Sequence, residues 1–178
     1  MERGTLVPVE EYLSTSYRPD QEYVDGTLVE RNVGERDHSE VQMALSAYLF
    51  NRRKELNVHV FPEQRVQVKP TRFRVPDVCV VAGERPSEQI LSSPPFLCVE
   101  ILSKDDRMSE MQERIDDYLS FGVRFVWLID PRTKRAYVYT VTGIHEAKDM
   151  IRTESRRSPS RCKSCSRISK HRNARRTA

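Results

Sequence analysis

Two long stretches of the chain carry apolar residues at helical spacing. In residues 38–55 these positions follow the i, i+3, i+4, i+7, i+8 rule of a helix that packs on a sheet. They are Val41, Ala44, Leu45, Tyr48 and Leu49. Residues 105–121 carry a similar stripe, and Gly122 follows it in the position of a C-terminal cap. The positions of this second stripe are Met108, Met111, Ile115, Tyr118 and Leu119. The pattern predicts two helices, each with one buried face.

Shorter apolar runs separated by turn residues indicate strands. They lie at residues 58–68, 74–81, 96–102, 123–131 and 136–141. Nearer the start, residues 5–17 suggest a short amphipathic helix, and residues 22–31 suggest a hairpin around Asp25-Gly26. This order predicts an α/β (α+β) fold, in which a mixed β-sheet is flanked by helices and preceded by an N-terminal helix and β-hairpin.

Charge divides the chain into two parts. Residues 151–178 contain ten Lys or Arg and one acid, which gives this segment a net charge of +9. Since the whole chain has a net charge of +4, the first 150 residues have a net charge of −5. The basic part has almost no apolar residues and cannot bury enough surface to offset the entropy of ordering. We expect a domain at residues 1–150 and a basic, disordered tail at 151–178, which is either a nonspecific nucleic-acid arm or an unselected extension.

No apolar segment approaches the roughly 20 residues that span a bilayer. The first residues, MERGTLVPVEEY, lack the basic start and apolar middle of a signal peptide. We therefore expect a cytoplasmic protein with no membrane contact.

One glutamate interrupts the apolar run at residues 96–102. Glu100 stands among Phe, Leu, Cys, Val and Ile residues, in a run typical of a strand buried on both faces. An ionised carboxylate there costs several kcal/mol unless it is paired. Glu100 therefore has a buried cationic partner or faces a functional site.

A second acid begins the preceding predicted strand. Asp77 lies between Pro76 and a Val-Cys-Val-Val run. If the two strands pair, both carboxylates can project from one face, where their repulsion favours a cation between them. Two carboxylates completed by waters suit Mg²⁺ or Mn²⁺, which polarises a phosphoryl oxygen and lowers the pKa of an attacking water. The alternative is that Asp77 caps a strand and that Glu100 is an edge residue paired with an arginine such as Arg74.

Several motifs follow the order and spacing of a nuclease family. They are Pro76-Asp77, Glu100 in a buried strand, Leu102-Ser103, GVRFVWLIDP at residues 122–131, the YVDG hairpin with Glu22 ahead of it, and His38 at the start of the first long helix. Over residues 6–141 the chain resembles the Uma-two family of restriction-endonuclease-like proteins, within the PD-(D/E)XK nuclease superfamily. The resemblance implies a restriction-endonuclease-like core, metal-dependent phosphodiester hydrolysis, Asp77 and Glu100 as metal ligands, and Glu22 as a further acid near the metal.

The chain departs from this pattern at the lysine that the superfamily places two residues after the strand acid. Leu102 occupies that position. The family that the chain resembles supplies a lysine from the following helix instead, and the matching position is Arg114. A guanidinium neutralises phosphate charge but cannot act as a general base. Because Arg114 borders the buried stripe of its helix, we expect its guanidinium to reach Glu100 or Glu22 and to hold that acid ionised without metal. Lys104 is another candidate, although a solvent-facing place near the helix start suits it better. A second expected departure is that the match ends near Val141.

Three functions follow from these observations. The first is a Mg²⁺- or Mn²⁺-dependent DNA endonuclease with Asp77 and Glu100 as metal ligands and with Glu22, His38 and Arg114 completing the catalytic set. The second is a catalytically inactive protein of the same fold that binds nucleic acid or a partner. The third is the product of a truncated or frameshifted reading frame.

DNA is the expected partner, and a homodimer is a further option. Because the first 150 residues carry a net charge of −5, local basic groups would have to provide the DNA surface. Candidates are Arg52, Arg53 and Lys54, or Arg72 and Arg74.

Overall fold

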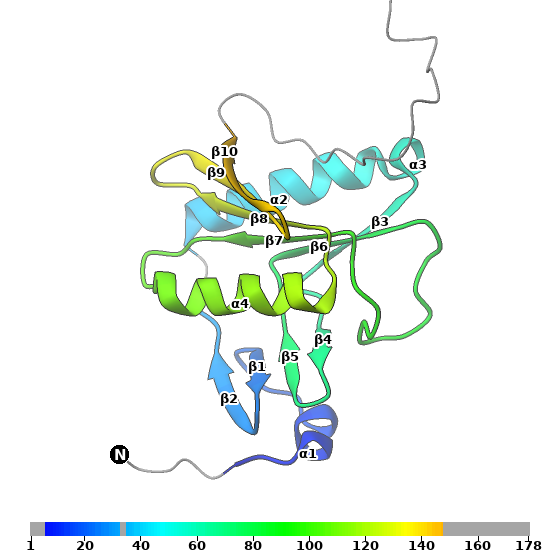
Figure 1. Cartoon of the computed structure of the whole chain (residues 1–178), viewed down its shortest axis with the longest axis vertical. Helices are drawn as coiled ribbons and strands as arrows, with labels where there is room; N and C mark the ends of the chain where they lie inside the picture. The colour runs from blue at the N-terminus through cyan, green and yellow to red at the C-terminus, as the bar shows by residue number, and fades with distance from the viewer. Residues whose placement is uncertain (1–5, 33–34, 148–178) are drawn as a thin grey trace, which may run out of the picture.

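A computed structural model describes residues 6–32 and 35–147. Its centre is a six-stranded mixed sheet, which Figure 1 shows between α2 and α4. Its strand order is β10-β9-β8-β7-β6-β3, and only β7 and β8 among these neighbours run parallel. The strands are β3 (Val58–Pro62), β6 (Val78–Ala82), β7 (Leu97–Ile101), β8 (Phe125–Asp130), β9 (Arg135–Thr140) and β10 (Gly143–Ala147). The predicted mixed sheet flanked by helices is thus confirmed.

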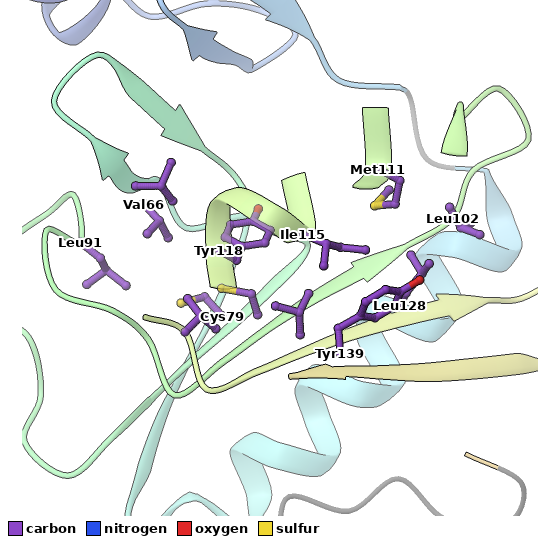
Figure 2. Close-up of a cluster of buried hydrophobic side chains, with 13 residues drawn as sticks. Val66, Cys79, Leu91, Leu102, Met111, Ile115, Tyr118, Leu128 and Tyr139 are labelled. Carbon is purple, nitrogen blue, oxygen red and sulfur yellow. The ribbon is translucent and has the colours of Figure 1, made fainter. Parts of the chain in front are cut away.

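Helices cover the two faces of this sheet (Figure 1). On one face α4 (Met108–Phe121) buries Met111, Ile115 and Tyr118 against strand residues such as Cys98, in the cluster that Figure 2 shows. On the other face α2 (Arg36–Asn51), followed by α3 (Arg53–Leu56), places Leu49 against β6, β7 and β8. Both predicted long helices are present, because each has one apolar stripe to bury.

Gly122 ends α4 as expected. Its φ of +108° lies in the left-handed region that favours glycine, and its N–H bonds back to the carbonyls of Leu119 and Tyr118. A Cβ at this position would also approach the Pro94 side chain to 3.3 Å. The chain can therefore turn directly from α4 into β8, which completes the crossover between the parallel strands β7 and β8.

A smaller antiparallel sheet packs with the N-terminal helix α1 (Val9–Ser14). Its strand order is β2-β1-β5-β4, and its strands are β1 (Gln21–Val24), β2 (Thr27–Glu30), β4 (Val66–Lys69) and β5 (Arg72–Arg74). Tyr12, Tyr23 and Phe73 form its buried aromatic cluster. The predicted hairpin is β1 and β2, whereas the helix is shorter than residues 5–17.

Two predicted strands are each divided between the two sheets. Residues 58–68 become β3 and β4, separated at Glu63, whose φ of +51° breaks the extended backbone. Residues 74–81 become the end of β5 and most of β6, separated at Pro76, which has no N–H for a strand ladder. The strand β10 was not predicted, because most of its residues are exposed and show no apolar alternation.

The prediction of a disordered tail at 151–178 falls outside the described residues. Within residues 6–32 and 35–147, the helices are all too short or too polar to cross a membrane.

Candidate functional site

The pairing of β6 with β7 brings the two candidate acids together. The strands are antiparallel, with Val78 opposite Val99, so the same register places Asp77, just before β6, beside Glu100. Side chains alternate along a strand, and Cys98 packs toward α4, so Glu100 points to the same face. The expectation that these two strands pair is confirmed.

Glu100 is buried, and little positive charge lies close enough to compensate its carboxylate. Its side chain is 3% exposed, and Oε1 accepts a 2.7 Å hydrogen bond from the Tyr118 hydroxyl. The closest cation to Oε2 is Arg114 Nη1, at 3.9 Å. Burial, followed by repulsion from Asp77, raises the pKa of Glu100 to about 8, although Arg114 and the Tyr118 hydrogen bond oppose this rise. Glu100 therefore lies in an environment that favours its protonated form until positive charge is added.

Asp77 is held by groups from three parts of the chain. Its Oδ2 accepts a 2.7 Å hydrogen bond from the backbone N–H of Ile101 and lies 3.3 Å from His38 Nε2. Its Oδ1 accepts a 2.8 Å bond from Arg31 Nη2. The Asp77 contact raises the pKa of His38 above its ordinary value, although burial opposes it. Asp77 is thus fixed between the sheet, the guanidinium of Arg31 and the imidazole of His38.

The acids face a small polar cavity of about 20 Å³. Its lining residues are Arg31, Asn32, His38, Asp77, Glu100, Ile101, Ser103, Asp106 and Arg114. A cavity of that size holds about one water molecule or one small ion. The structure therefore brings four of the five predicted catalytic residues, Asp77, Glu100, His38 and Arg114, to one point.

Glu22 lies behind Arg114 rather than in the cavity lining. Its Oε2 accepts bonds from Arg74 Nη1 at 2.8 Å and from Arg114 Nε at 3.2 Å, and its Oε1 accepts from the backbone N–H of Val75 at 3.0 Å. Its side chain is 1% exposed. Glu22 therefore reaches the site through Arg114, which links it to Glu100.

Arg114 points its guanidinium at both Glu22 and Glu100, as expected. We also expected this contact to keep the acid ionised without metal, and for Glu100 that expectation is wrong. Burial and the nearby Asp77 outweigh an arginine at 3.9 Å, so the pKa of Glu100 rises. The reason is distance: coulombic attraction weakens with separation, while the cost of burial does not.

The alternative interpretation, in which Asp77 caps a strand and Glu100 is an edge residue paired with Arg74, also differs from the structure. Arg74 pairs with Glu22 and Asp117, not with Glu100, and Glu100 lies on β7, a central strand with neighbours on both sides. Asp77 does hydrogen-bond a backbone N–H, but to Ile101 on the neighbouring strand. A local strand cap therefore does not describe it.

The expected DNA-binding patches are largely engaged within the protein. Arg72 pairs with Asp25, Glu113 and Asp117, and the side chain of Arg74 is only 4% exposed. On the other patch, Arg52 pairs with Glu55. The expectation that Arg72 and Arg74 provide a DNA-binding patch is wrong, because both arginines pair with buried acids.

Lysine is absent from the place where the superfamily has it. Leu102 belongs to the apolar cluster beneath α4 (Figure 2). Lys104 pairs with Glu35 and has a side chain that is 58% exposed, which confirms its solvent-facing position. Among the described residues, Arg31 and Arg114 therefore supply the permanent positive charge that lines the cavity.

Sequence reasoning missed two contributors to the site. Arg31 directly follows the β2 strand of the smaller sheet, and nothing in its sequence context indicates a contact with a residue 46 positions away. Tyr118 was assigned to the apolar stripe of its helix, where its ring does pack. A tyrosine in such a stripe usually finds a partner for its hydroxyl, and that signal pointed to a buried acceptor.

The donor set fits a small divalent cation. Residues 6–32 and 35–147 contain no group of three or more His, Cys, Asp or Glu side chains arranged to hold a metal ion. Mg²⁺, however, commonly uses one or two carboxylates and takes its remaining ligands from water and substrate phosphate. Asp77 and Glu100 provide two hard oxygen donors beside a cavity of suitable size.

Comparison of the chain with solved structures supports this fold. A structure from Anabaena variabilis ATCC 29413, described as a "putative nuclease belonging to DUF820", aligns with a TM-score of 0.69 and 24% identity, over 77% of this chain and 82% of that one. A DrdV-DNA complex aligns with a TM-score of 0.45 and 15% identity, over 64% of this chain and 10% of that one, a likeness too weak to carry an argument. None of the curated proteins compared with the chain matches it.

A family model provides the identification. The model Uma2, described as "Putative restriction endonuclease", matches residues 9–161. The expectation that the resemblance ends near Val141 is therefore wrong, because the match continues into the basic segment. Since this match spans most of the sequence, the chain belongs to the Uma2 family of restriction-endonuclease-like proteins.

Proposed function

We propose that the protein is a Mg²⁺- or Mn²⁺-dependent DNA endonuclease that hydrolyses phosphodiester bonds with a metal-activated water. The observation that carries the proposal is the convergence of Asp77 and Glu100, from paired strand positions, on one small polar cavity. A buried acid with a raised pKa beside a second acid does not stabilise the fold, but the pair is suited to bind a cation. Membership of the Uma2 family agrees with this chemistry.

The side chains of the site have distinct roles in this proposal. Asp77 and Glu100 would hold the ion, which when bound polarises a phosphoryl oxygen and lowers the pKa of water. Arg114 lies at the cavity with its guanidinium permanently protonated, so it neutralises charge on the phosphate but removes no proton. Tyr118 fixes Glu100 by its 2.7 Å hydrogen bond.

His38 is the titratable group best placed to handle a proton. Its Nε2 contacts Asp77, while its Nδ1 is buried with no hydrogen-bond partner among the described residues. A buried imidazole nitrogen without a partner is costly, and a substrate oxygen or an ordered water in the cavity would satisfy it. We assign His38 the role of orienting that group or holding its proton.

An inactive, nucleic-acid-binding or partner-binding protein is the second candidate. The observation that favours it is the replacement of the lysine by the buried Leu102 and by Arg114, which is already engaged with Glu22. A protein of this kind would retain DNA without cutting it when a divalent ion is added. A gel-shift assay run on the same samples as the cleavage assay separates the two functions.

The decisive experiment is a plasmid-nicking assay with Mg²⁺ or Mn²⁺. Wild-type protein should nick supercoiled DNA, while Glu100→Gln and Asp77→Asn should lose at least about 100-fold of the rate, because each removes one of only two protein ligands. Glu110→Gln is the matched control, since that side chain is 57% exposed and pairs only loosely with Arg107. Equal nicking by wild type and Glu100→Gln would refute the proposed site.

A further inference from the structure

Arg31 forms an ion pair with Asp77, one of the two carboxylates that a metal ion would need. Its Nη2 donates to Asp77 Oδ1 at 2.8 Å, and its side chain is 16% exposed. The residue directly follows β2 of the smaller sheet but reaches the acid that precedes β6 of the larger one. The contact therefore joins the two sheets at the candidate site.

Arg31 also lines a second, wider space. An open groove of about 470 Å³ adjoins the site, and Arg31, Asn32 and Ser103 border both the groove and the small cavity. Lys104 also lines the groove. The Arg31 side chain thus stands at the boundary between the buried acids and a space large enough for a nucleic-acid backbone.

A divalent ion and this guanidinium compete for the same oxygen. An ion bound to Asp77 at about 2.1 Å would lie a few ångströms from the guanidinium that now contacts Oδ1, where two like charges repel strongly. The 2.8 Å contact and the ion cannot both persist unchanged, so the Arg31 head group has to move. The groove is the adjoining open space that Arg31 already borders.

A phosphate would meet the displaced guanidinium there. A phosphodiester that approaches an ion on Asp77 carries its oxygens to the mouth of the cavity, and a guanidinium fork matches phosphate oxygens better than a single carboxylate oxygen. The groove also contains Glu30, Glu35 and Asp105. Its attraction for phosphate should therefore depend strongly on the positive charge of Arg31.

We propose that Arg31 is an exchangeable cation, which neutralises Asp77 when the site holds no metal and binds a phosphate of the DNA strand when a divalent ion takes its place. The proposal rests on the proposed nuclease function and adds a substrate-binding residue to it. It makes two predictions of opposite sign for one substitution. Removing Arg31 should strengthen metal binding and weaken DNA binding.

The test compares full-length wild type with Arg31→Ala and Arg31→Lys. Mn²⁺ affinity is measured by titration calorimetry, and DNA affinity by fluorescence anisotropy of a labelled 20-base-pair duplex with Ca²⁺ present. Arg31→Ala should bind Mn²⁺ about tenfold more tightly and DNA about tenfold more weakly. Arg31→Lys keeps the positive charge but loses the fork, so its Mn²⁺ affinity should stay near wild type while its DNA affinity falls about threefold.

Arg36→Ala is the matched control. Arg36 begins α2 close in sequence to the site, but its side chain is 83% exposed and pairs with Asp37 at the surface. Its removal should leave Mn²⁺ affinity unchanged and reduce DNA affinity by less than twofold. Thermal melts of all variants check folding, and Arg31→Lys provides a folded comparison if Arg31→Ala is unstable.

Other outcomes separate the two proposals. If Arg31→Ala binds both Mn²⁺ and DNA more weakly, Arg31 is only a structural support and the inference fails. If its two affinities equal those of wild type, the exchange does not occur. If wild type binds no Mn²⁺ but Arg31→Ala does, the nuclease function fails for the natural chain while displacement at Asp77 is supported. If neither binds Mn²⁺, both proposals fail.

Discussion

Asp117 and Glu100 are two buried acids whose surroundings differ. Their side chains are each 3% exposed. Lys69, Arg72 and Arg74 all contact Asp117, at 2.7 to 3.1 Å. Burial raises the pKa of Asp117, but these cations outweigh it, so the net pKa is lowered. Glu100 has one hydroxyl and a distant arginine, and its pKa rises to about 8.

The difference distinguishes structural acids from an acid available for function. The carboxylate of Asp117 is saturated by donors from β4 and β5, so it ties the smaller sheet to α4. The carboxylate of Glu100 is left short of positive charge beside a cavity. Folding alone gains nothing from an under-compensated buried acid. We therefore expect substitutions at the two positions to change stability in opposite directions.

Asp117→Asn should have the largest effect. Without the negative charge, Arg74, whose side chain is 4% exposed, keeps Glu22 and Glu113 as its acidic neighbours among the residues that the structure describes. Loss of one partner in a buried ion-pair network costs on the order of 3 kcal/mol. Denaturant unfolding should show this loss, while Asp116→Asn, next to it on the exposed side of α4, should change stability by less than about 0.5 kcal/mol.

Glu100→Gln should stabilise the metal-free protein. The amide oxygen can still accept the hydrogen bond from Tyr118, and the buried charge is gone. At pH 8 in EDTA we expect a gain on the order of 2 kcal/mol in the free energy of unfolding, together with loss of nicking. A destabilised Glu100→Gln would mean that the ionised acid contributes to folding, and the contrast with Asp117 would disappear.

The pH dependence of stability should show the same contrast. Between the ordinary value of 4.5 and about 8, folded Glu100 binds more protons than the unfolded chain, so stability falls as pH rises through this window. Asp117 acts oppositely: its lowered pKa stabilises the fold above its ordinary value, and this contribution is lost as pH falls. The His38 contribution also declines with rising pH.

Unfolding free energies measured from about pH 2.5 to pH 9 in EDTA would test this profile. Wild type should lose roughly 1 kcal/mol per pH unit between about pH 5 and pH 8, and Glu100→Gln should be nearly flat there apart from the His38 contribution. The decline below pH 3.8, the ordinary value of Asp117, should persist in Glu100→Gln. Parallel profiles for wild type and Glu100→Gln across pH 5–8 would show that Glu100 does not titrate in this range.

Local patterns predicted most elements of the fold but not their division between sheets. The stripe of α4, its glycine cap and the β1–β2 hairpin depend on neighbours in sequence. The chain passes from one sheet to the other at Glu63 and at Pro76. The positions of these breaks depend on which strands β4 and β5 pair with, and β5 pairs with β1, about 50 residues earlier. Tertiary pairing of this kind leaves little trace in a local pattern.

The candidate site was predictable only in part for the same reason. Glu100 was conspicuous because a carboxylate in a buried strand is costly, and Asp77 because its strand directly precedes that of Glu100. The partners that decide their charge state are Arg31, 46 residues from Asp77, and Tyr118, 18 residues from Glu100. Register and helix rotation bring them together, and neither can be read from spacing.

Arg114 connects the two regions, and its substitution should have the smallest effect on stability. It contacts Glu22, which also pairs with Arg74 of the Asp117 network, and it faces Glu100 across 3.9 Å. Arg114→Lys keeps the charge but loses the Nε contact, so we expect a loss of about 1 kcal/mol. Arg114→Ala should cost more than the roughly 0.5 kcal/mol of a solvated residue, because the side chain is 12% exposed.

The activity of Arg114→Lys tests whether the site is a weakened nuclease. Lysine is the residue expected at this helix position from the family resemblance, and unlike arginine it can lose its proton when buried. If arginine limits catalysis, Arg114→Lys should raise the Mn²⁺-dependent nicking rate, by about tenfold, in the plasmid assay. If wild type and Arg114→Lys both bind Mn²⁺ and neither cuts DNA, arginine is not the limiting feature. The under-compensated Glu100 would then belong to a binding site, and the inactive-protein hypothesis would gain its strongest support.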